Sequence, residues 1–449
     1  MQSTVRGAVV TTEIPAVRLN PILWILMFSC TLNFLDRQVI NILAEPIKIE
    51  FRLSDAELGA LAGLAFAAFH AALSLPVARL ADRWDRAFVL AGSTIVWSLA
   101  TIASGLTVTF GQLVAARIAV GAGEAGGIAP AHALIADAAP PERRARAIAF
   151  YSAGIPLGGL LGMVLGGFVL DAFGWRTAFV LAGLPGLLLG PLILLFVRDP
   201  RRATRSGPAR SATPGLAMTL RQMAASRSFV LIVVAGALTM FCNFAQAAFL
   251  ASFFFRAHGP ELGELASGAG HVLGVAMGAA ALLGLLLGLT KGFGGILGSL
   301  AGGALTDRLN SGDDRACASV PAVVAVLRIP VFAAALLVGS PALAFALLAA
   351  HAVLAGVGSI GGFTAVQGLV PANLRATAAA VYALGVNLVG LALGPLAVGL
   401  LSDHFASAGG LGPADGLRWS LIVVSSLVMI PVALLGWAAA RSIGRDKVS

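Results

Sequence analysis

A single glutamate, Glu124, stands among glycines in the stretch RIAVGAGEAGGIAP, which runs from Arg117 to Pro130. The segment GAGEAG has the glycine spacing of a dinucleotide-binding fingerprint. That fingerprint has meaning only where a strand ends, a tight turn follows and a helix opens beneath a pyrophosphate. Apolar residues surround the segment instead, so the sequence does not support a phosphate loop. The carboxylate of Glu124 therefore needs another explanation.

Four ionisable residues in apolar runs are candidates for chemistry: Asp36, Arg37, Arg117 and Glu124. A helix turns by about 100° per residue, so the neighbours Asp36 and Arg37 point apart and need partners on another helix. Arg117 and Glu124 are two turns apart on one face, with a rise of about 10 Å between them. Two roles remain open for these residues: proton transfer through a titratable carboxylate, or an ion-pair network that only fixes the packing of helices.

The composition places these charges in a membrane. Hydrophobic residues make up 58% of the 449 residues and charged residues only 11%, whereas charged residues are about 25% of a typical soluble protein. The apolar runs are each about 20 residues or longer, which is the length of a membrane-spanning helix, while barrel strands are about 10 residues long. The sequence predicts an all-α integral membrane protein.

Hydropathy divides the chain into two sets of six spans. We expect an N-terminal tail at 1–20, a six-helix bundle at 21–197, a linker at 198–228, a second bundle at 229–440 and a tail at 441–449. The spans are expected at 21–44, 56–81, 87–108, 111–137, 145–171, 175–197, 229–256, 270–305, 317–338, 342–368, 374–403 and 417–440. The eighth span is longer than one crossing requires, and a short surface helix before it is the simplest interpretation.

Arginines concentrate in the loops on one side of these spans. The positive-inside rule makes that side cytoplasmic, with both termini and the linker on it, and we expect the chain in a bacterial inner membrane. The net charge of +9 follows from this asymmetry and from contact with membrane lipids, so we expect no nucleic-acid partner. The three cysteines have no CxxC spacing, and we expect neither a metal nor another cofactor.

The two sets of six spans are internal repeats. The stretch ERRARAIAFYSAGIPLGG aligns with ANLRATAAAVYALGVNLVG, which pairs Tyr151 with Tyr382. LADRWDR, from Leu80, aligns with LTDRL, from Leu305, so that Asp82 and Arg83 match Asp307 and Arg308. Parallel repeats of this kind predict a binding site between the halves near the membrane midplane.

Depth along the helices predicts which buried charges meet. Counted from the outer ends of spans one and four, Arg117 lies roughly 9 Å deep, Asp36 and Arg37 roughly 12 to 14 Å, and Glu124 roughly 20 Å. Asp36 is therefore expected to meet Arg117, and Arg37 to meet Glu124. The glycines around Glu124 would let another backbone approach closely and let the helix bend.

Several of these motifs resemble a known family. LADRWDR, LTDRL and RIAVGAGE are similar to signature motifs of the major facilitator superfamily, although Ala78 and Asp85 stand where that family's turn motif usually has glycine. NFLDRQV, RIAVGAGEAGGIAPAHALIAD and AFYSAGIPLGGLLG resemble its Spinster branch. The resemblance implies a proton-coupled secondary transporter of an amphipathic or lipid-like solute, and Spinster relatives are associated with lysolipids and sphingolipid derivatives.

The resemblance also implies a cytoplasmic latch built from Asp82, Arg83, Asp307 and Arg308, although these charges could simply set the topology. A passive facilitator of the same fold, in which the buried charges are structural, remains an alternative. A membrane-embedded enzyme is disfavoured because the sequence contains no GxSxG, HExxH or Walker motif. We expect a monomer whose partners are its small-molecule or lipid-like substrate, protons and membrane lipids.

Further polar residues within the spans are candidates for lining a substrate cavity. They are His70, His132, Tyr151, Tyr382, Asn387 and Arg328. A lone histidine in a membrane helix is more often a hydrogen-bonded core residue than a proton relay. Arg328 and Lys291 could bind an anionic headgroup, although the Lys291 ammonium could instead extend to the membrane surface.

Overall fold

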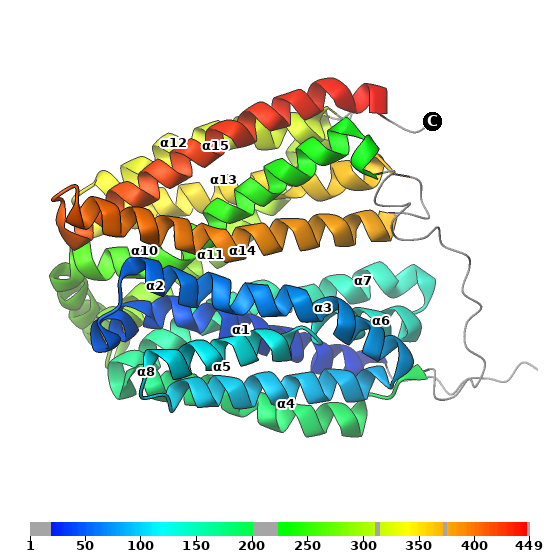
Figure 1. Cartoon of the computed structure of the whole chain (residues 1–449), viewed down its shortest axis with the longest axis horizontal. Coiled ribbons are helices and arrows are strands. Elements are labelled where there is room, and N and C mark those ends of the chain that lie inside the picture. The colour runs from blue at the N-terminus through cyan, green and yellow to red at the C-terminus, as the bar shows by residue number, and fades with distance from the viewer. Residues whose placement is uncertain (1–18, 201–222, 310–314, 371–374, 447–449) are drawn as a thin grey trace, which may run out of the picture.

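The computed structural model describes residues 19–200, 223–309, 315–370 and 375–446, and every regular element in these ranges is a helix (Figure 1). The first half contains α1 (Leu19–Phe51), α2 (Asp55–Gly59), the π-helical η1 (Ala60–Leu64), α3 (Ala65–Arg83), α4 (Arg86–Gly105), α5 (Phe110–Glu124), α6 (Ile128–Ala138), α7 (Pro141–Ser152) and α8 (Gly154–Phe196). The second half contains α10 (Arg227–Leu273), α11 (Ala279–Leu309), α12 (Ala316–Leu337), α13 (Pro341–Gly368), α14 (Arg375–Ser407) and α15 (Gly412–Asp446).

The helices account for the predicted twelve spans. Ten helical segments are long and apolar enough to cross a membrane. One of them, 142–196, holds two spans because the chain leaves helical geometry at Gly174, whose φ of 80° suits glycine. The 33-residue α1 supplies the remaining span. The second span combines α2, η1 and α3, and the fourth combines α5 and α6.

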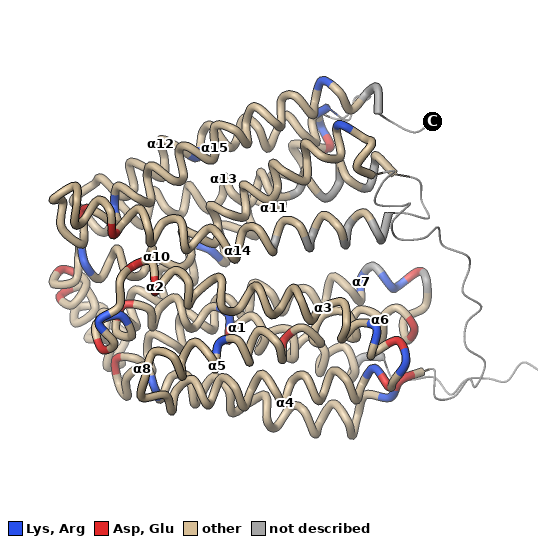
Figure 2. Tube along the Cα trace, viewed as in Figure 1, with Lys and Arg blue, Asp and Glu red and all other residues tan. Residues whose placement is uncertain are grey.

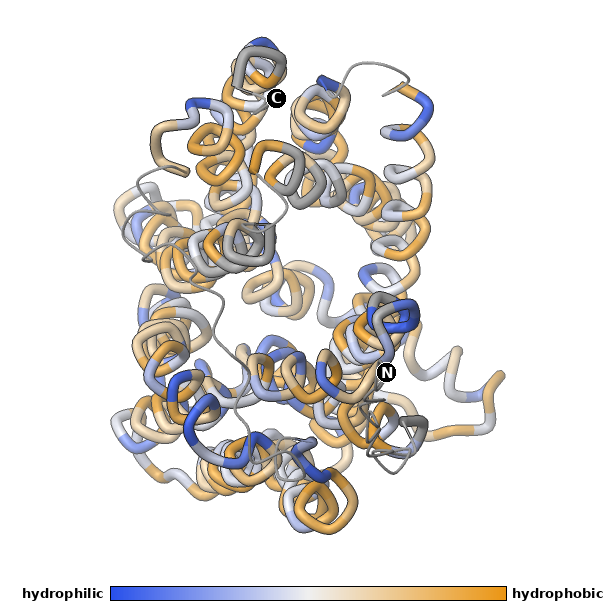
Figure 3. The backbone as a smooth tube through the Cα atoms, turned by 90° about the vertical axis from the view of Figure 1, so that its right-hand side faces the viewer, coloured by the Kyte–Doolittle hydropathy of each residue, from blue (hydrophilic) through white to orange (hydrophobic). Residues whose placement is uncertain are grey.

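The two halves lie side by side (Figures 1 and 3). α1 to α8 form one bundle and α10 to α15 the other, with the long helices running roughly parallel to the longest axis. The end of α8 and the start of α10, which flank the linker, lie at the same end of the molecule. We call this the linker end, at the right of Figure 1, and the opposite end the far end.

Two predicted boundaries differ from the ends of the helices. The eighth span was expected from 270, but α10 continues to Leu273 and α11 begins at Ala279. α10 breaks at His258 (φ −135°), and the short helical segment beyond the break buries Leu262 and Ala266 fully in the hydrophobic core. This segment is the short helix that the sequence predicted before the eighth span. The tail expected at 441–449 also begins as helix, because α15 continues to Asp446.

Glycine ladders form close seams between helices, as their spacing predicts. A methyl group on Gly154, Gly158 or Gly162 of α8 would lie less than 3 Å from the α1 backbone. Gly298 and Gly302 of α11 meet the backbone of α13 in the same way. These seams hold helices together within each half.

A substitution in the first seam tests this packing. Gly158→Ala would place its methyl group 2.2 Å from the carbonyl oxygen of Thr31, whereas Gly159→Ala, one residue later, would meet nothing closer than 3.9 Å. We expect Gly158→Ala to lower the melting temperature of the purified protein by several degrees, because either α1 or α8 must shift. Gly159→Ala is the control and should leave it unchanged. Equal melting temperatures for both variants would contradict the seam.

Candidate functional site

The four ionisable residues singled out in the first half form two ion pairs between α1 and α5. Arg37 donates from Nε to Oε2 of Glu124 at 2.5 Å, and Arg117 donates from a terminal guanidinium nitrogen to Oδ1 of Asp36 at 3.5 Å. Both pairings match the expectation from helix depth. Glu124, Asp36 and Arg117 are at most 2% exposed. We call these four residues the charge cluster; whether they carry protons stays a prediction.

Two residues that the sequence did not indicate contact the charge cluster. Thr101 of α4 donates its hydroxyl proton to Asp36. The ring of Phe66 lies 4.9 Å from the Arg37 guanidinium and 5.8 Å from that of Arg117, within range of cation–π attraction. His70, one turn further, stacks on Phe66. These partners come from two other helices, α3 and α4, so no local sequence pattern could have identified them.

Glu124 keeps unused hydrogen-bonding capacity. Its Oε2 accepts from Arg37, but its Oε1 is buried and has no hydrogen-bond partner within the part of the chain that the structure describes. The same holds for both side-chain amide atoms of Asn33, one turn before Arg37 on α1. Because Oε1 is not engaged, it can hold a proton without a competing donor.

The glycines of the GAGEAG motif around Glu124 lie where neighbouring helices approach closely. A methyl group on Gly121 would lie 2.4 Å from the carbonyl oxygen of Phe66, and one on Gly123 would lie 2.7 Å from the backbone nitrogen of Trp97. The fourth span therefore packs directly on α3 and α4. Its helix is also interrupted, since α5 ends at Glu124 and α6 begins at Ile128. GAGEAG is a packing surface that encloses the glutamate.

A second ionic network joins the two halves at the far end. Arg256 of α10 makes paired hydrogen bonds of 2.8 to 2.9 Å with the carboxylate of Glu45 on α1, and of 2.7 to 2.9 Å with that of Asp55 on α2. Asp55 also accepts from Lys48 and from the hydroxyl of Ser402. A bidentate arginine at 8% side-chain exposure is a strong, directional link.

Two aspartates reinforce this closure in equivalent positions of the repeats. Asp403, near the end of α14, accepts from the backbone N–H groups of Asp55 and Ala56 at the start of the second span, both at 2.8 Å. Asp171 of α8 accepts from those of Ala280 and Ala281, at 3.2 and 2.7 Å, at the start of α11. Each carboxylate thus caps a helix of the opposite half, where the helix dipole favours negative charge.

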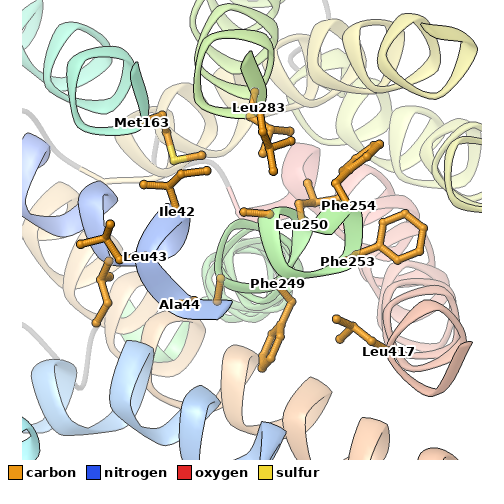
Figure 4. Packing of buried hydrophobic residues seen from close by; sticks show 14 of the residues in the cluster. Ile42, Leu43, Ala44, Met163, Phe249, Leu250, Phe253, Phe254, Leu283 and Leu417 are labelled. Carbon is orange, nitrogen blue, oxygen red and sulfur yellow. The ribbon is translucent and has the colours of Figure 1, made fainter. Parts of the chain in front are cut away.

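Apolar packing at the far end also crosses the interface between the halves. Figure 4 shows Ile42 of α1 and Met163 of α8 facing Leu250 of α10 and Leu283 of α11, within one buried cluster that also contains Leu43. Figure 2 shows the charges gathered mainly at the two ends of the molecule. The far end is therefore closed by a hydrophobic layer with the ionic network around Arg256.

The predicted latch residues lie at the other end. Asp82 and Arg83 end α3, Asp307 and Arg308 lie in the last turn of α11, and all four are exposed at the linker end. Their latch role stays a prediction. The far-end network was not predicted, because its members are more than 200 residues apart in the chain.

A cavity of about 720 Å³ lies between the halves. α10, α11, α12 and α13 supply most of its lining, and Gln38 and Pro156 supply the first half's share. Of the predicted cavity residues, Arg328 lines it, whereas His70, His132 and Tyr151 do not; His132 instead packs edge-on against Tyr151. Tyr382 lines a separate cavity of about 460 Å³ within the second half. The side chain of Asn387 lies outside the described residues.

Removing the arginine at the centre of the far-end network tests whether it holds the halves together. We expect Arg256→Ala to leave the carboxylates of Glu45 and Asp55 facing each other and to favour opening of the far end. Spin labels on cysteines at the exposed positions Phe173 and Ala408, on opposite halves of that end, should show longer distances.

Arg176→Ala is the matched control. Arg176 lies at the same end but pairs with Glu50 inside the first half, so its loss should leave the distances unchanged. Equal distance distributions in the wild type and in Arg256→Ala would show that this end stays closed without Arg256.

Comparison with known proteins agrees with this architecture. A family model described as Major Facilitator Superfamily matches residues 26–395. An MFS-type efflux pump of Mycolicibacterium smegmatis is 32% identical over 418 residues, which cover 93% of this chain and 91% of that protein. The sphingosine-1-phosphate transporter SPNS2 of Danio rerio is 29% identical over 238 residues, covering 52% of this chain and 47% of that protein.

Solved structures share this fold over nearly the whole chain. A bacterial homologue of the human lysosomal transporter Spinster, in an inward-facing and unoccupied conformation, superposes with a TM-score of 0.81 at 28% identity and covers 96% of this chain and 98% of its own. The inward-facing and occupied conformation gives a TM-score of 0.79. The protein belongs to the Major Facilitator Superfamily, and it is a multi-pass membrane transporter of the Spinster type.

Proposed function

We propose that the protein is a secondary active transporter that moves an amphipathic, lipid-like organic solute by alternating access and is driven by protons. The observation that carries this proposal is the buried carboxylate of Glu124. One of its oxygens pairs with Arg37, and the other has no partner among the described residues. A group that can take up a proton at this position can change the charge balance of the charge cluster.

Protonation of Glu124 removes the negative charge that holds Arg37. The Arg37 guanidinium is then a buried cation with a weakened partner, which is costly in a membrane helix. A conformation in which Arg37 contacts water or another hydrogen-bond acceptor then becomes more stable relative to the one described here. The equilibrium between the two conformations shifts toward it. The protonation state of the charge cluster therefore shifts the equilibrium between the two conformations.

α1 connects the charge cluster to the cavity and to the far-end network. It carries Arg37 of the charge cluster, Gln38 of the cavity lining and Glu45 of the far-end network. Arg37 and Glu45 are roughly 12 Å apart along the helix axis. A shift of α1 on release of Arg37 would move the Glu45 carboxylate that Arg256 holds. Proton uptake and opening of the far end would thus be coupled through one rigid element.

We assign the linker end to the cytoplasm of a bacterial cell, with the chain a monomer in the inner membrane. The arginine-rich loops support this orientation. With the far end closed, the described state is then inward-facing, like the solved Spinster homologue that it matches. Asp82, Arg83, Asp307 and Arg308 would form the opposite latch when the linker end closes.

The cavity supports an amphipathic substrate. Its lining is mostly apolar, with a small number of polar side chains, which is the usual composition of a site for such ligands. SPNS2 of Danio rerio, a relative, is a sphingosine-1-phosphate transporter. A passive facilitator of the same substrate is the alternative, with the charge cluster serving only to pin α1 to α5.

Transport in proteoliposomes separates these alternatives. The probes are three lipids with the same fluorescent acyl chain: the anionic lysophosphatidic acid, the zwitterionic lysophosphatidylcholine and the cationic acylcholine. A pH gradient should drive transport of at least one probe in the wild type. In Glu124→Gln, gradient-driven transport should fall at least about tenfold while exchange without a gradient persists, because the amide cannot exchange a proton.

Glu142→Gln, which changes an exposed carboxylate on α7, is the control and should behave as the wild type. Gradient-driven transport that survives Glu124→Gln would assign the charge cluster a structural role. So would a Glu124→Gln protein that does not fold.

A further inference from the structure

The cavity lining from the second half carries charge of one sign. Lys291 of α11 and Arg328 of α12 line the cavity, and they are the charged residues in its lining, which contains no carboxylate among the described residues. In the first half, by contrast, two arginines pair with two carboxylates and the formal charges of the charge cluster cancel. The cavity wall therefore holds two cations without a compensating anion.

Neutral groups hold Arg328 in place. Its Nε donates to Nε2 of His351 at 3.2 Å, and a terminal nitrogen donates to the side-chain oxygen of Asn243 at 2.7 Å. Arg328 is only 4% exposed. These acceptors fix the orientation of the guanidinium but leave its charge uncompensated, which is costly for a buried arginine. A bound anion would supply the missing partner.

Lys291 makes no hydrogen bond or ion pair with any residue in the described ranges, and it is half-buried. It lies roughly 18 Å along α11 from Ala279, near the middle of the span, which is too deep for its ammonium group to extend to the membrane surface. Methyl groups on Gly292 and Gly295, which also line the cavity, would contact nothing within 4 Å. There is thus open space beside the ammonium group.

Four leucines of the lining suit an apolar tail. They are Leu250, Leu287, Leu300 and Leu348, and their side chains offer no charge to a ligand. A ligand with an anionic head between Lys291 and Arg328 and an apolar tail against these leucines would satisfy both parts of the cavity.

We propose that Lys291 and Arg328 form a headgroup site that selects anionic amphipathic substrates, those that carry a phosphate or carboxylate, over zwitterionic and cationic ones. This inference rests on the proposed transport function and adds the charge of the substrate. Arg328, oriented by His351 and Asn243, makes the directional contact, and the flexible ammonium group of Lys291 adds a second positive charge.

Equilibrium binding to the purified full-length protein in neutral detergent tests the proposal, with the same three fluorescent lipids followed by anisotropy. The lysophosphatidic acid should bind at least about tenfold more tightly than the cationic acylcholine. Lys291→Gln should weaken its binding about tenfold or more, because a hydrogen bond to a charged group is lost. Lys291→Arg should restore most of it, and Arg441→Gln, which removes an exposed cation of α15 outside the cavity, should leave it unchanged.

Competition identifies the source of the anion. Phenylphosphonate that displaces the lysophosphatidic acid at similar concentrations points to a small organic anion as substrate, and displacement only by lipids points to a lipid headgroup; either result supports an anion site. Equal binding of all three lipids, or unchanged binding in Lys291→Gln, would overturn the anion site and leave amphipathic transport standing. Failure of all three probes to bind or to be transported would overturn both proposals.

Discussion

A charge buried in a membrane helix must find its partner on another helix, and this constraint organises the whole transporter. Arg37 and Glu124 tie α1 to α5, and Arg256 ties α10 to α1 and α2. The glycine seams allow the helices to approach closely enough for these short contacts. An ion pair that protonation can break allows protons to change the conformation. A buried cation without a protein partner can bind an anionic ligand.

The two repeats share an architecture but carry different buried charges. The first half carries the balanced charge cluster, and at the repeat-related position of Glu124 the second half has Ser359, whose hydroxyl binds its own helix backbone. The second half instead carries the uncompensated cations Lys291 and Arg328. Proton coupling in one half and substrate charge in the other would be linked by α1, which contacts the charge cluster, the cavity and the far end.

The sequence predicted most of the fold because hydropathy and the repeats are local signals. It also predicted both ion pairs of the charge cluster, since depth along a helix follows from counting residues. It did not predict the capping aspartates Asp171 and Asp403 or the role of Arg256, because their partners depend on how two separately folded halves dock. It placed the start of the eighth span before the start of α11, because the burial of Leu262 in the short helical segment beyond the break in α10 depends on tertiary packing.

The central claim is that the protonation state of Glu124 sets the balance between the two conformations. The most direct test is the distance between spin labels at positions 173 and 408 across the far end, measured as a function of pH in the wild type and in Glu124→Gln. We predict that the wild-type distance distribution changes with pH, and that Glu124→Gln gives the low-pH distribution at every pH, because its amide mimics the protonated acid. A Glu124→Gln protein that responds to pH as the wild type does would contradict the account.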